Sequence, residues 1–494
     1  MTHSYTNNHK TVLGIGGALN HDASVSIVKG NEILFAAHAE RYSKIKNDPL
    51  LNKEILQDAF QYGTPDVIAW YENPYKKKTR QLYAGQYKTA FDMDELPKNY
   101  LQQFPELKGI PIEYQSHHST HAASGYHTSG FTHAAVVVID SIGEWETLTI
   151  WQGSGSTVSK VYSQKYPDSL GLFYSAMTQR LGLKANEDEY ILMGMSAYGD
   201  PWRFFDSIKA EICDAKSLHR GCMWWNPDLK EEDYFDVAAA TQMIYELIFR
   251  KMLEETQKLT RNSNLVFSGG CALNCLANRH IRQYFDNHWI MPNPGDAGSS
   301  IGAVAARNKT RIEWDTPYLG YDIKGAYPID DMLRELKDNK IVGVANGKAE
   351  FGPRSLGNRS LLADPRGQEM KVLVNKIKKR QEFRPFAPVI LQEDVHKYFK
   401  VNRRFKSPYM QEIVECRNPE LFPAIVHKDG TSRIQTVNSE QHSGLAQLLR
   451  RWKAEGNHPI LLNTSLNIKG QPMVNTEVDG KEFTEKYGVK VCVG

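Results

Sequence analysis

Cysteine is scarce in this sequence. Six cysteines occur in 494 residues, and no two of them form a Cys-x-x-Cys pair. This excludes a disulfide framework and favours a reducing compartment. A chain of this length can bury several hydrophobic cores, so neither disulfides nor oligomerisation is needed for basic stability.

Long apolar runs and an excess of one charge are also missing. The longest strongly apolar run, Ala134 to Ile139, has six residues, whereas a membrane-spanning helix needs about 20. The N-terminal segment is polar and lacks the apolar region of a signal peptide. Lys and Arg number 60 against 57 Asp and Glu, which argues against a basic nucleic-acid coat protein. We expect a soluble, cytoplasmic enzyme or binding protein of about three domains or lobes.

Two segments share the order strand, polar glycine-containing turn, strand. The first runs from Val12 to Ala37 and the second from Ala134 to Trp151, and each pattern predicts paired strands. Their similarity suggests a duplicated α/β fold. Further along, the spacing of apolar residues predicts a helix over 236–261, and we expect a domain boundary near 325–345.

A histidine pair is the first candidate site. His117 and His121 are four residues apart, so on a helix they share one face and can reach one cation. Asp140 ends a predicted strand, and Asp296 lies in a glycine-containing loop before a predicted helix. Imidazole suits Fe, Zn, Ni or Co. The pattern also fits a histidine cluster without a metal, and Asp296 also fits a simple helix cap.

Two glycine-rich segments are candidates for anion binding. In the first, 268–274, glycines follow a predicted strand and precede a helix, where phosphate or ribose oxygens bind well. Such a turn can equally serve packing alone. The second, 352–360, combines Gly with Arg and is followed by an Arg-containing segment at 380–388. Arginine recognises oxyanions in a bidentate manner, and interleaved apolar residues argue against a purely solvated basic face.

The segment 71–88 mixes tyrosines with basic residues. It carries five Lys or Arg and one Glu. This composition suits a nucleic-acid or phosphate-binding surface, and equally a solvated helix.

Taken together, the motifs resemble one family, the O-carbamoyltransferases of nodulation-factor, cephamycin and aminoglycoside antibiotic biosynthesis. The resemblance runs from about residue 12 to 476. It is carried by nine motifs in order, at 16–24, 117–121, 140–144, 193–199, 268–274, 296–298, 352–360, 383–388 and 463–467.

The resemblance implies an actin/Hsp70-like duplicated domain over 1–335 and a YrdC-like α/β domain over 336–494. Carbamoyl phosphate would enter the second domain. A carbamoyl species would then react with ATP in the first domain to give carbamoyl-adenylate, and the hydroxyl of a small-molecule acceptor would attack it. Fe(II) or another divalent metal is implied, with Mg²⁺ as an additional ion.

The resemblance also carries over site residues. It makes His21 the base near the acceptor hydroxyl, a task that suits imidazole. The implied metal ligands are His117, His121, Asp140 and Asp296. The implied nucleotide-binding residues are Gly269, Gly270 and Asn274, and those for carbamoyl phosphate are Arg354, Arg380, Arg384, Arg433, Asn463 and Ser465.

The chain departs from the family at several points. It is shorter than typical members, Ser141 and Leu466 replace the usual residues, and the stretch 477–494 differs from the usual ending. These departures bear on the acceptor, so a 5-hydroxymethylated base in a nucleotide or nucleic acid stays an alternative to a small metabolite. A metal- and nucleotide-binding regulator without catalysis is the second alternative. The oligomeric state is left open.

Overall fold

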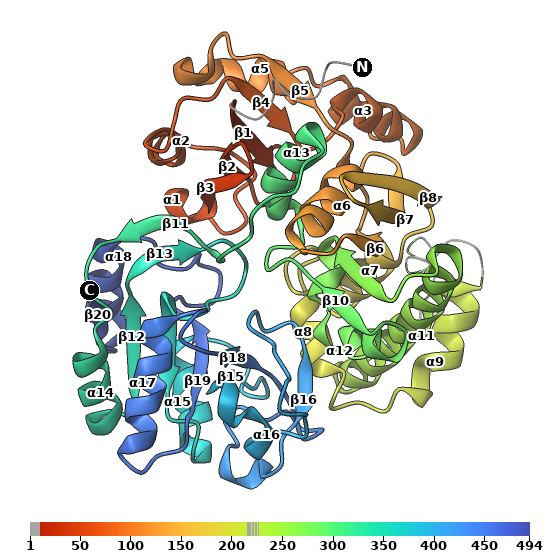
Figure 1. The fold of residues 1–494 in the computed structure, drawn as a ribbon. Coiled ribbons are helices and arrows are strands. Elements are labelled where there is room, and N and C mark those ends of the chain that lie inside the picture. Colours follow the sequence, from red (N-terminus) through yellow and green to blue (C-terminus); the bar gives the residue numbers. More distant parts are fainter. Residues whose placement is uncertain (1–9, 215–218, 220–221, 223–224, 226) are drawn as a thin grey trace. The chain divides into compact units, whose positions relative to one another are not determined.

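The computed structural model describes residues 10–214, 219, 222, 225 and 227–494 (Figure 1). The chain divides into two compact units. Unit 1 holds the described residues up to Ala36 together with Pro49–Trp314, and unit 2 holds Ala37–Asp48 and Asp315–Gly494. The predicted boundary between the two functional domains, at residues 335 and 336, stays a prediction. Within the described residues, no helix is both long and apolar enough to cross a membrane.

Unit 1 contains two five-stranded sheets. The strand order of the first is β3-β2-β1-β4-β5. Its central strand β1 runs antiparallel to β2 and parallel to β4, and β4 runs parallel to β5. The bounds are β1 Thr11–Gly16, β2 Ser24–Lys29, β3 Glu32–His38, β4 Val67–Trp70 and β5 Ile112–Tyr114.

The second sheet repeats this topology, with the order β10-β9-β6-β7-β8. Its central strand β6 runs antiparallel to β7 and parallel to β9, and β9 runs parallel to β10. In both sheets the first strand in sequence is central, with the next two on one side and the last two on the other. The predicted duplication is therefore confirmed. The bounds are β6 His133–Ile139, β7 Glu146–Ser154, β8 Thr157–Lys165, β9 Asn264–Ser268 and β10 Asn287–Trp289.

Two helices pack closely between the sheets of unit 1 (Figure 1). Helix α13 (Ser299–Asn308) packs against both β1 and helix α6 (His117–Thr128). Glycine makes this approach possible: a Cβ on Gly14 would lie 2.0 Å from the carbonyl oxygen of Ser300, and one on Gly302 would lie 2.2 Å from that of Thr120. These contacts hold the start of α13 beside the end of β1.

The remaining helices of unit 1 surround the two sheets. The longest, α11, spans Tyr234–Thr260 and confirms the helix predicted over 236–261. The others are α2 Lys53–Phe60, α3 Pro74–Tyr83, α4 Tyr87–Phe91, α5 Pro97–Tyr100, α7 Leu170–Arg180, α8 Glu189–Met195, α9 Trp202–Ile208 and α12 Cys275–Asn278.

Unit 2 is built on a six-stranded mixed sheet with the order β18-β15-β19-β14-β12-β20. Both faces of this sheet are buried, because alternate residues of its strands enter two different apolar clusters: Leu361 enters one and Leu362 the other, as do Leu462 and Leu461. The bounds are β12 Ile341–Ala345, β14 Arg359–Ala363, β15 Ala387–Leu391, β18 Gln435–Val437, β19 Ile460–Ser465 and β20 Val491–Val493.

Helices cover the two faces of this sheet. Helices α14 and α17 supply side chains to one apolar cluster, and α15 and α18 supply side chains to the other. The atypical C-terminal stretch is thus part of the core, as α18 and β20. The helices are α1 Glu40–Ser43, α14 Ile329–Asp338, α15 Gln368–Ile377, α16 Val395–Tyr398, α17 Ser443–Ala454 and α18 Glu477–Tyr487, and the smaller strand pairs are β11 Tyr318–Ile323 with β13 Gly347–Glu350 and β16 Ile413–Glu415 with β17 Thr431–Arg433.

A buried arginine ties the loops of unit 2 together. The side chain of Arg359 is fully buried, and burial lowers its pKa to about 10, so it stays charged at neutral pH. Glu350 supports the same corner, because its Oε1 accepts hydrogen bonds from the backbone N–H groups of Leu356, Asn358 and Arg359. The guanidinium of Arg359 donates to the carbonyl oxygens of Tyr321, Asn346, Gly347, Asn358 and Asn475.

We expect Arg359→Met to lower the free energy of unfolding by about 3 to 5 kcal/mol. The substitution leaves buried carbonyl oxygens without hydrogen-bond donors and removes the positive charge near Glu350. Urea unfolding followed by near-UV circular dichroism measures this. The matched control is Arg334→Met, which removes an exposed ion pair with Asp331 in the same unit and should change stability by less than about 1 kcal/mol. Equal effects of the two substitutions would contradict the role assigned to Arg359.

Candidate active site

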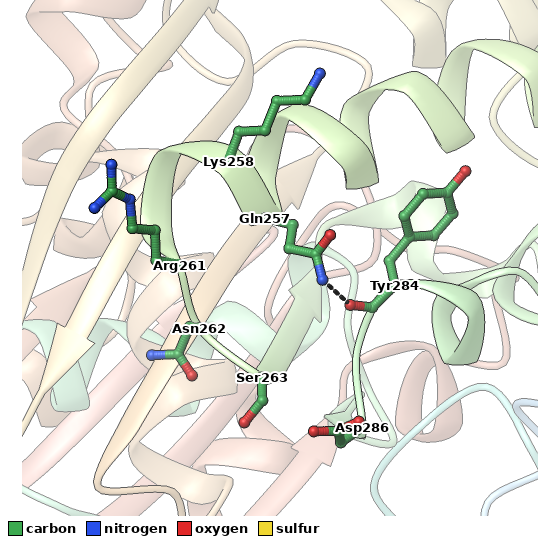
Figure 2. Close-up of a pocket in the computed structure, with 7 residues that line it drawn as sticks. All are labelled: Gln257, Lys258, Arg261, Asn262, Ser263, Tyr284 and Asp286. Carbon is green, nitrogen blue, oxygen red and sulfur yellow. Dashed lines mark hydrogen bonds between the residues drawn. The ribbon is translucent and has the colours of Figure 1, made fainter.

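A surface hollow lies in unit 1 and is lined by residues around the end of α11 (Figure 2). Its volume is about 470 Å³. It lies where α11 ends and before β9 and β10 begin, whereas the glycine loop 269–274 follows the other end of β9. Gln257 in this hollow donates to the carbonyl oxygen of Tyr284 and so holds the two segments together. None of the predicted site residues lines it.

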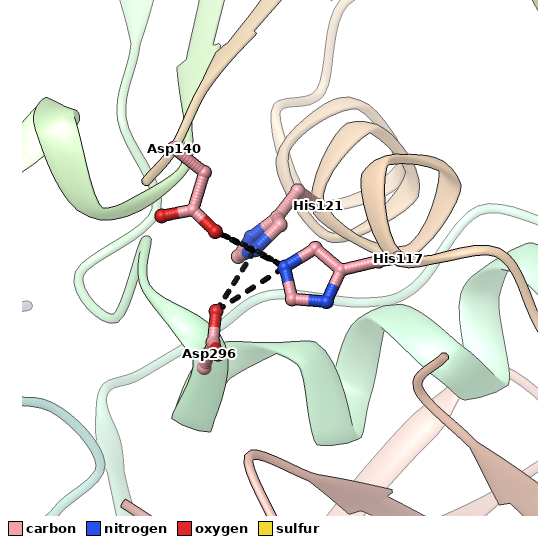
Figure 3. A group of neighbouring side chains, drawn as sticks. All are labelled: His117, His121, Asp140 and Asp296. Carbon is pink, nitrogen blue, oxygen red and sulfur yellow. Dashed lines mark hydrogen bonds and ion pairs between the residues drawn. The ribbon is translucent and has the colours of Figure 1, made fainter. Parts of the chain in front are cut away.

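The four predicted metal ligands converge in unit 1 (Figure 3). His117 and His121 lie one turn apart on α6, Asp140 directly follows β6, and Asp296 lies just before α13. One ligand atom from each residue lies within 4.8 Å of all the others. The common topology of the two sheets explains the convergence, since Asp140 lies at the end of a central strand and α13 is held beside the other central strand, β1.

The distances within this four-residue cluster suit a single divalent ion. The two histidine Nε2 atoms are 3.1 Å apart, Nε2 of His117 is 3.1 Å from Asp140 Oδ2, and Nε2 of His121 is 3.2 Å from Asp296 Oδ1. Nitrogen and oxygen ligands about 2.1 Å from one metal are separated by roughly 3.0 to 3.4 Å. The two imidazoles and two carboxylates present therefore fit a transition-metal ion.

The electrostatics of this cluster also call for a cation. Burial by itself disfavours the charged form of His117, yet the charges of Asp296 and Asp140 hold its pKa well above the ordinary value. The pKa of Asp296 is held well below its ordinary value by the two histidines, despite burial. Two buried carboxylates thus need positive charge beside them, which either protonated imidazole or a metal ion can supply.

Neighbouring groups hold the ligands in place. The backbone N–H of Gly270 donates to Oδ1 of Asp140 over 3.3 Å, and Nδ2 of Asn20 donates to Oδ2 of Asp296 over 3.2 Å. Gly143 leaves room for the ring of His117, because a Cβ there would lie 2.5 Å from it. The carboxylates thus present their remaining oxygens to the histidines.

His118, the middle histidine of the motif, takes no part in the cluster. Its Nδ1 lies 2.9 Å from Thr149 Oγ1 on β7. Burial and the nearby His117 lower its pKa well below the ordinary value, so it is neutral. Neighbours along a helix point about 100° apart, which separates its role from that of His117.

The glycine loop 269–274 adjoins the cluster. Gly269 has a φ of +91°, and a Cβ there would lie 2.1 Å from the carbonyl oxygen of Ile139 at the end of β6. Asn274 is committed to the fold, because its Oδ1 accepts from the Ala277 N–H over 3.1 Å and its Nδ2 donates to Gln242 over 3.0 Å. The backbone N–H groups of the two glycines are engaged as well, since Gly269 donates to the carbonyl oxygen of Pro294 over 2.9 Å and Gly270 donates to Asp140.

His21 lies in the loop between β1 and β2. Its Nε2 is buried and has no hydrogen-bond partner among the described residues. The same loop is anchored at the cluster through Asn20 and Asp296. A half-buried imidazole with an unpartnered nitrogen, next to a candidate metal centre, is suitable for accepting a proton.

The predicted carbamoyl-phosphate residues lie in unit 2, and Asn463 bonds to the chain segments that carry two of the others. Nδ2 of Asn463 on β19 donates to the carbonyl oxygen of Ser355 and to Oε1 of Gln435. Ser355 directly follows Arg354, and Gln435 lies two residues after Arg433. Arg380 is committed to the fold, since it donates to Asn375 and Pro385 and lies 3.9 Å above the ring of Phe386.

The sequence prediction missed Lys378, which lies among these residues. It is buried, and its Nζ donates to Ser465 and Asn467, including 2.5 Å to the Ser465 carbonyl oxygen. Burial and the charges of Arg380 and Arg384 lower its pKa well below the ordinary value. The only hint in the sequence was the spacing: Lys378 comes four residues after the apolar Val374, so on a helix the two lie on the same side, which is buried in α15.

Known proteins are similar to this chain over nearly its whole length. An uncharacterised protein of Synechocystis is 31% identical over 95% of this chain and 93% of its own length. Nodulation protein NolO of Bradyrhizobium diazoefficiens is 32% identical over 74% of this chain and 75% of its own. The 3'-hydroxymethylcephem-O-carbamoyltransferase of Amycolatopsis lactamdurans is 26% identical over 96% of both chains. Among solved structures, full-length HypF aligns with 62% of this chain and 47% of its own at 16% identity, with a TM-score of 0.34.

Two family models match the chain in sequence order. The model described as Carbamoyltransferase N-terminus matches residues 11–305, and the one described as Carbamoyltransferase C-terminus matches residues 333–493. Together they include both candidate sites and nearly all of the described residues. The chain therefore belongs to the carbamoyltransferase family and is a transferase enzyme.

Proposed function

We propose that the enzyme is an ATP-dependent O-carbamoyltransferase that acts on a hydroxyl group of a small metabolite. The observation that carries the proposal is the convergence of four metal-ligating side chains beside the glycine loop 269–274 in unit 1. Family membership supports carbamoyl transfer, and one relative is named for O-carbamoyl transfer to a hydroxymethyl compound. The role of unit 2 as a YrdC-like carbamoyl-phosphate domain belongs to the same proposal.

The four-residue cluster would hold one divalent ion. Its nitrogen and oxygen ligands suit iron, zinc, nickel or cobalt, and Fe(II) is our assignment from the family resemblance. When bound, the ion supplies positive charge that binds and polarises phosphate or carbamoyl oxygens. Mg²⁺ accompanying ATP is a separate requirement. Gly269 and Gly270 would line the nucleotide site, because the absence of side chains lets a ligand approach their backbone.

The first stage takes place in unit 2. Arg354, Arg384 and Arg433, with Ser465, would hold the phosphoryl and carbamoyl oxygens of the substrate, and the buried Lys378 would hold Ser465 in place. Water adds to carbamoyl phosphate, the bond between carbamoyl carbon and bridging oxygen breaks, and phosphate and carbamate are formed. Asn463 orders the surrounding loop through Ser355 and Gln435, and Arg380 orders the segment that carries Arg384.

The second stage takes place in unit 1. A carbamate oxygen attacks the α-phosphorus of ATP, the bond to the β-phosphate breaks, and pyrophosphate and carbamoyl-adenylate are formed. The acceptor hydroxyl then attacks the carbamoyl carbon, AMP leaves with the bridging oxygen, and the hydroxyl proton passes to Nε2 of His21. The unpartnered state of this nitrogen supports that last role.

Two alternatives to this function are a hydroxymethylated base as the acceptor and a regulator without catalysis, and the contacts of the residues concerned favour neither. In the segment 71–88, Lys77 pairs with Glu72, Lys78 donates to the carbonyl oxygens of Thr89 and Asp92, and Arg80 donates to Glu144 and Gln86. These basic groups are committed to local contacts, which weakens the nucleic-acid proposal. Retention of His21, with its unpartnered Nε2, and of the Arg residues of unit 2 argues against a regulator that has lost catalysis.

Metal binding tests the four-residue cluster. We expect the wild-type enzyme to bind one divalent ion per chain, and His117→Ala or Asp140→Ala to weaken binding by about 100-fold or more, because each removes a ligand. Elemental analysis after dialysis gives the stoichiometry, and chelator competition gives the affinity. His118→Asn is the matched control, since His118 lies on the same helix outside the cluster. Equal loss in this control would contradict the ligand assignment.

Pyrophosphate release tests the reaction. We expect ATP to yield pyrophosphate only when carbamoyl phosphate is present, and His117→Ala or Asp140→Ala to abolish the release. A coupled assay for pyrophosphate, with AMP measured by chromatography, follows both stages. Release that is independent of carbamoyl phosphate would contradict the proposed order. Acceptors are then screened by mass spectrometry for a gain of about 43 Da, the carbamoyl-for-hydrogen increment of this reaction class, with hydroxymethylated DNA as the polymer to compare.

A further inference from the structure

The outward-facing nitrogen of His117 has an unusual environment. Nε2 of this ring faces the cluster, whereas Nδ1 is buried and has no hydrogen-bond partner among the described residues. A ligand histidine nearly always donates this second N–H to a carboxylate, carbonyl or water, which fixes the ring and keeps the other nitrogen's lone pair free. The structure should therefore contain a group that can serve Nδ1 when the site is loaded.

Glu72 lies in the position to do so. Its Oε2 is 3.9 Å from Nδ1 of His117, and its side chain is only 5% exposed. Glu72 follows β4 by two residues, so the first sheet of unit 1 fixes its backbone. A hydrogen bond needs about 2.9 Å, so a shift of roughly 1 Å of a side chain would complete the contact.

A lysine holds the other oxygen of this carboxylate. Nζ of Lys77, one turn into α3, lies 2.8 Å from Oε1 of Glu72. The lysine thus compensates the buried charge and leaves Oε2 directed at the histidine. The adjacent Tyr71 packs its ring against that of His117, with ring centroids 5.4 Å apart, and so limits how the imidazole can turn.

The second ligand histidine has a different outer neighbour. Nδ1 of His121 is 3.5 Å from the hydroxyl of Ser299, a neutral group at the start of α13. A carboxylate raises the basicity of the ligand histidine more than a hydroxyl does, because it stabilises positive charge on the ring. The two histidines of the cluster are therefore not equivalent.

We propose that Glu72, held by Lys77, is the positioning residue of the metal centre, accepting the Nδ1 proton of His117 so that its Nε2 binds the ion. This inference rests on the proposed metal site. Glu72 does not touch the ion or the substrates. It acts through the orientation and basicity of His117, and it connects the metal centre to the start of α3.

Zinc affinity, measured with Zn²⁺ as a redox-inert probe in the full-length chain, tests this role. We expect Glu72→Gln to weaken zinc binding 10- to 100-fold, about the range found for carboxylates behind ligand histidines, in protein that near-UV circular dichroism shows to be folded. Glu72→Asp keeps the charge but shortens the reach, so a comparable loss is expected. This second variant keeps the test available if Glu72→Gln does not fold.

Ser299→Ala is the matched control, because it removes the neutral outer neighbour of the other histidine. We expect it to change zinc affinity by less than about threefold. Unchanged affinity in both Glu72 variants, with zinc binding normally to the wild type, would overturn the role of Glu72 and leave the metal centre standing. Failure of the wild-type enzyme to bind zinc, iron or cobalt would instead overturn the metal centre itself and this inference with it.

Discussion

Two buried carboxylates close together in space are the constraint on which the active site of unit 1 depends. Asp140 and Asp296 come from opposite parts of the duplicated fold, and both lie within reach of His117 and His121. Mutual repulsion in a poorly solvated place would drive them apart or protonate one of them. Positive charge between them, on imidazole or on a metal ion, offsets this repulsion. It thereby holds the end of β6 and the start of α13 together.

The duplicated fold creates this meeting point, and glycine allows it to close. Each sheet has a central strand that ends at the site, and Gly14 and Gly302 let α13 approach β1 and α6 at backbone distance. Gly269 and Gly270 do the same for the loop after β9, so that a backbone N–H reaches Asp140. Larger residues at these positions would separate the elements that carry the ligands.

In unit 2, unlike in the cluster of unit 1, two buried basic side chains are not paired with carboxylates. Arg359 and Lys378 are both buried basic side chains, and in both the donor groups are satisfied chiefly by carbonyl oxygens rather than by carboxylates. Arg359 uses every direction of its guanidinium to hold loops, which makes it structural. Burial together with the charges of Arg380 and Arg384 lowers the pKa of Lys378 well below its ordinary value.

The family, the duplicated α/β fold and the four residues that form the cluster could all be predicted from the amino-acid sequence. The two histidines four residues apart, the aspartate at the end of an apolar strand and the glycines at a turn are short-range patterns, and the resemblance to the family joins them into one ligand set. The packed structure was needed to show which polar side chains are already hydrogen-bonded within the fold. The resemblance assigns both Asn274 and Arg380 to ligand binding, yet their side chains bond to Gln242, Ala277, Asn375 and Pro385. Glu72 and Lys378 stand in no recognisable motif, because their importance comes from neighbours that are distant in sequence and that meet only when sheets and helices pack.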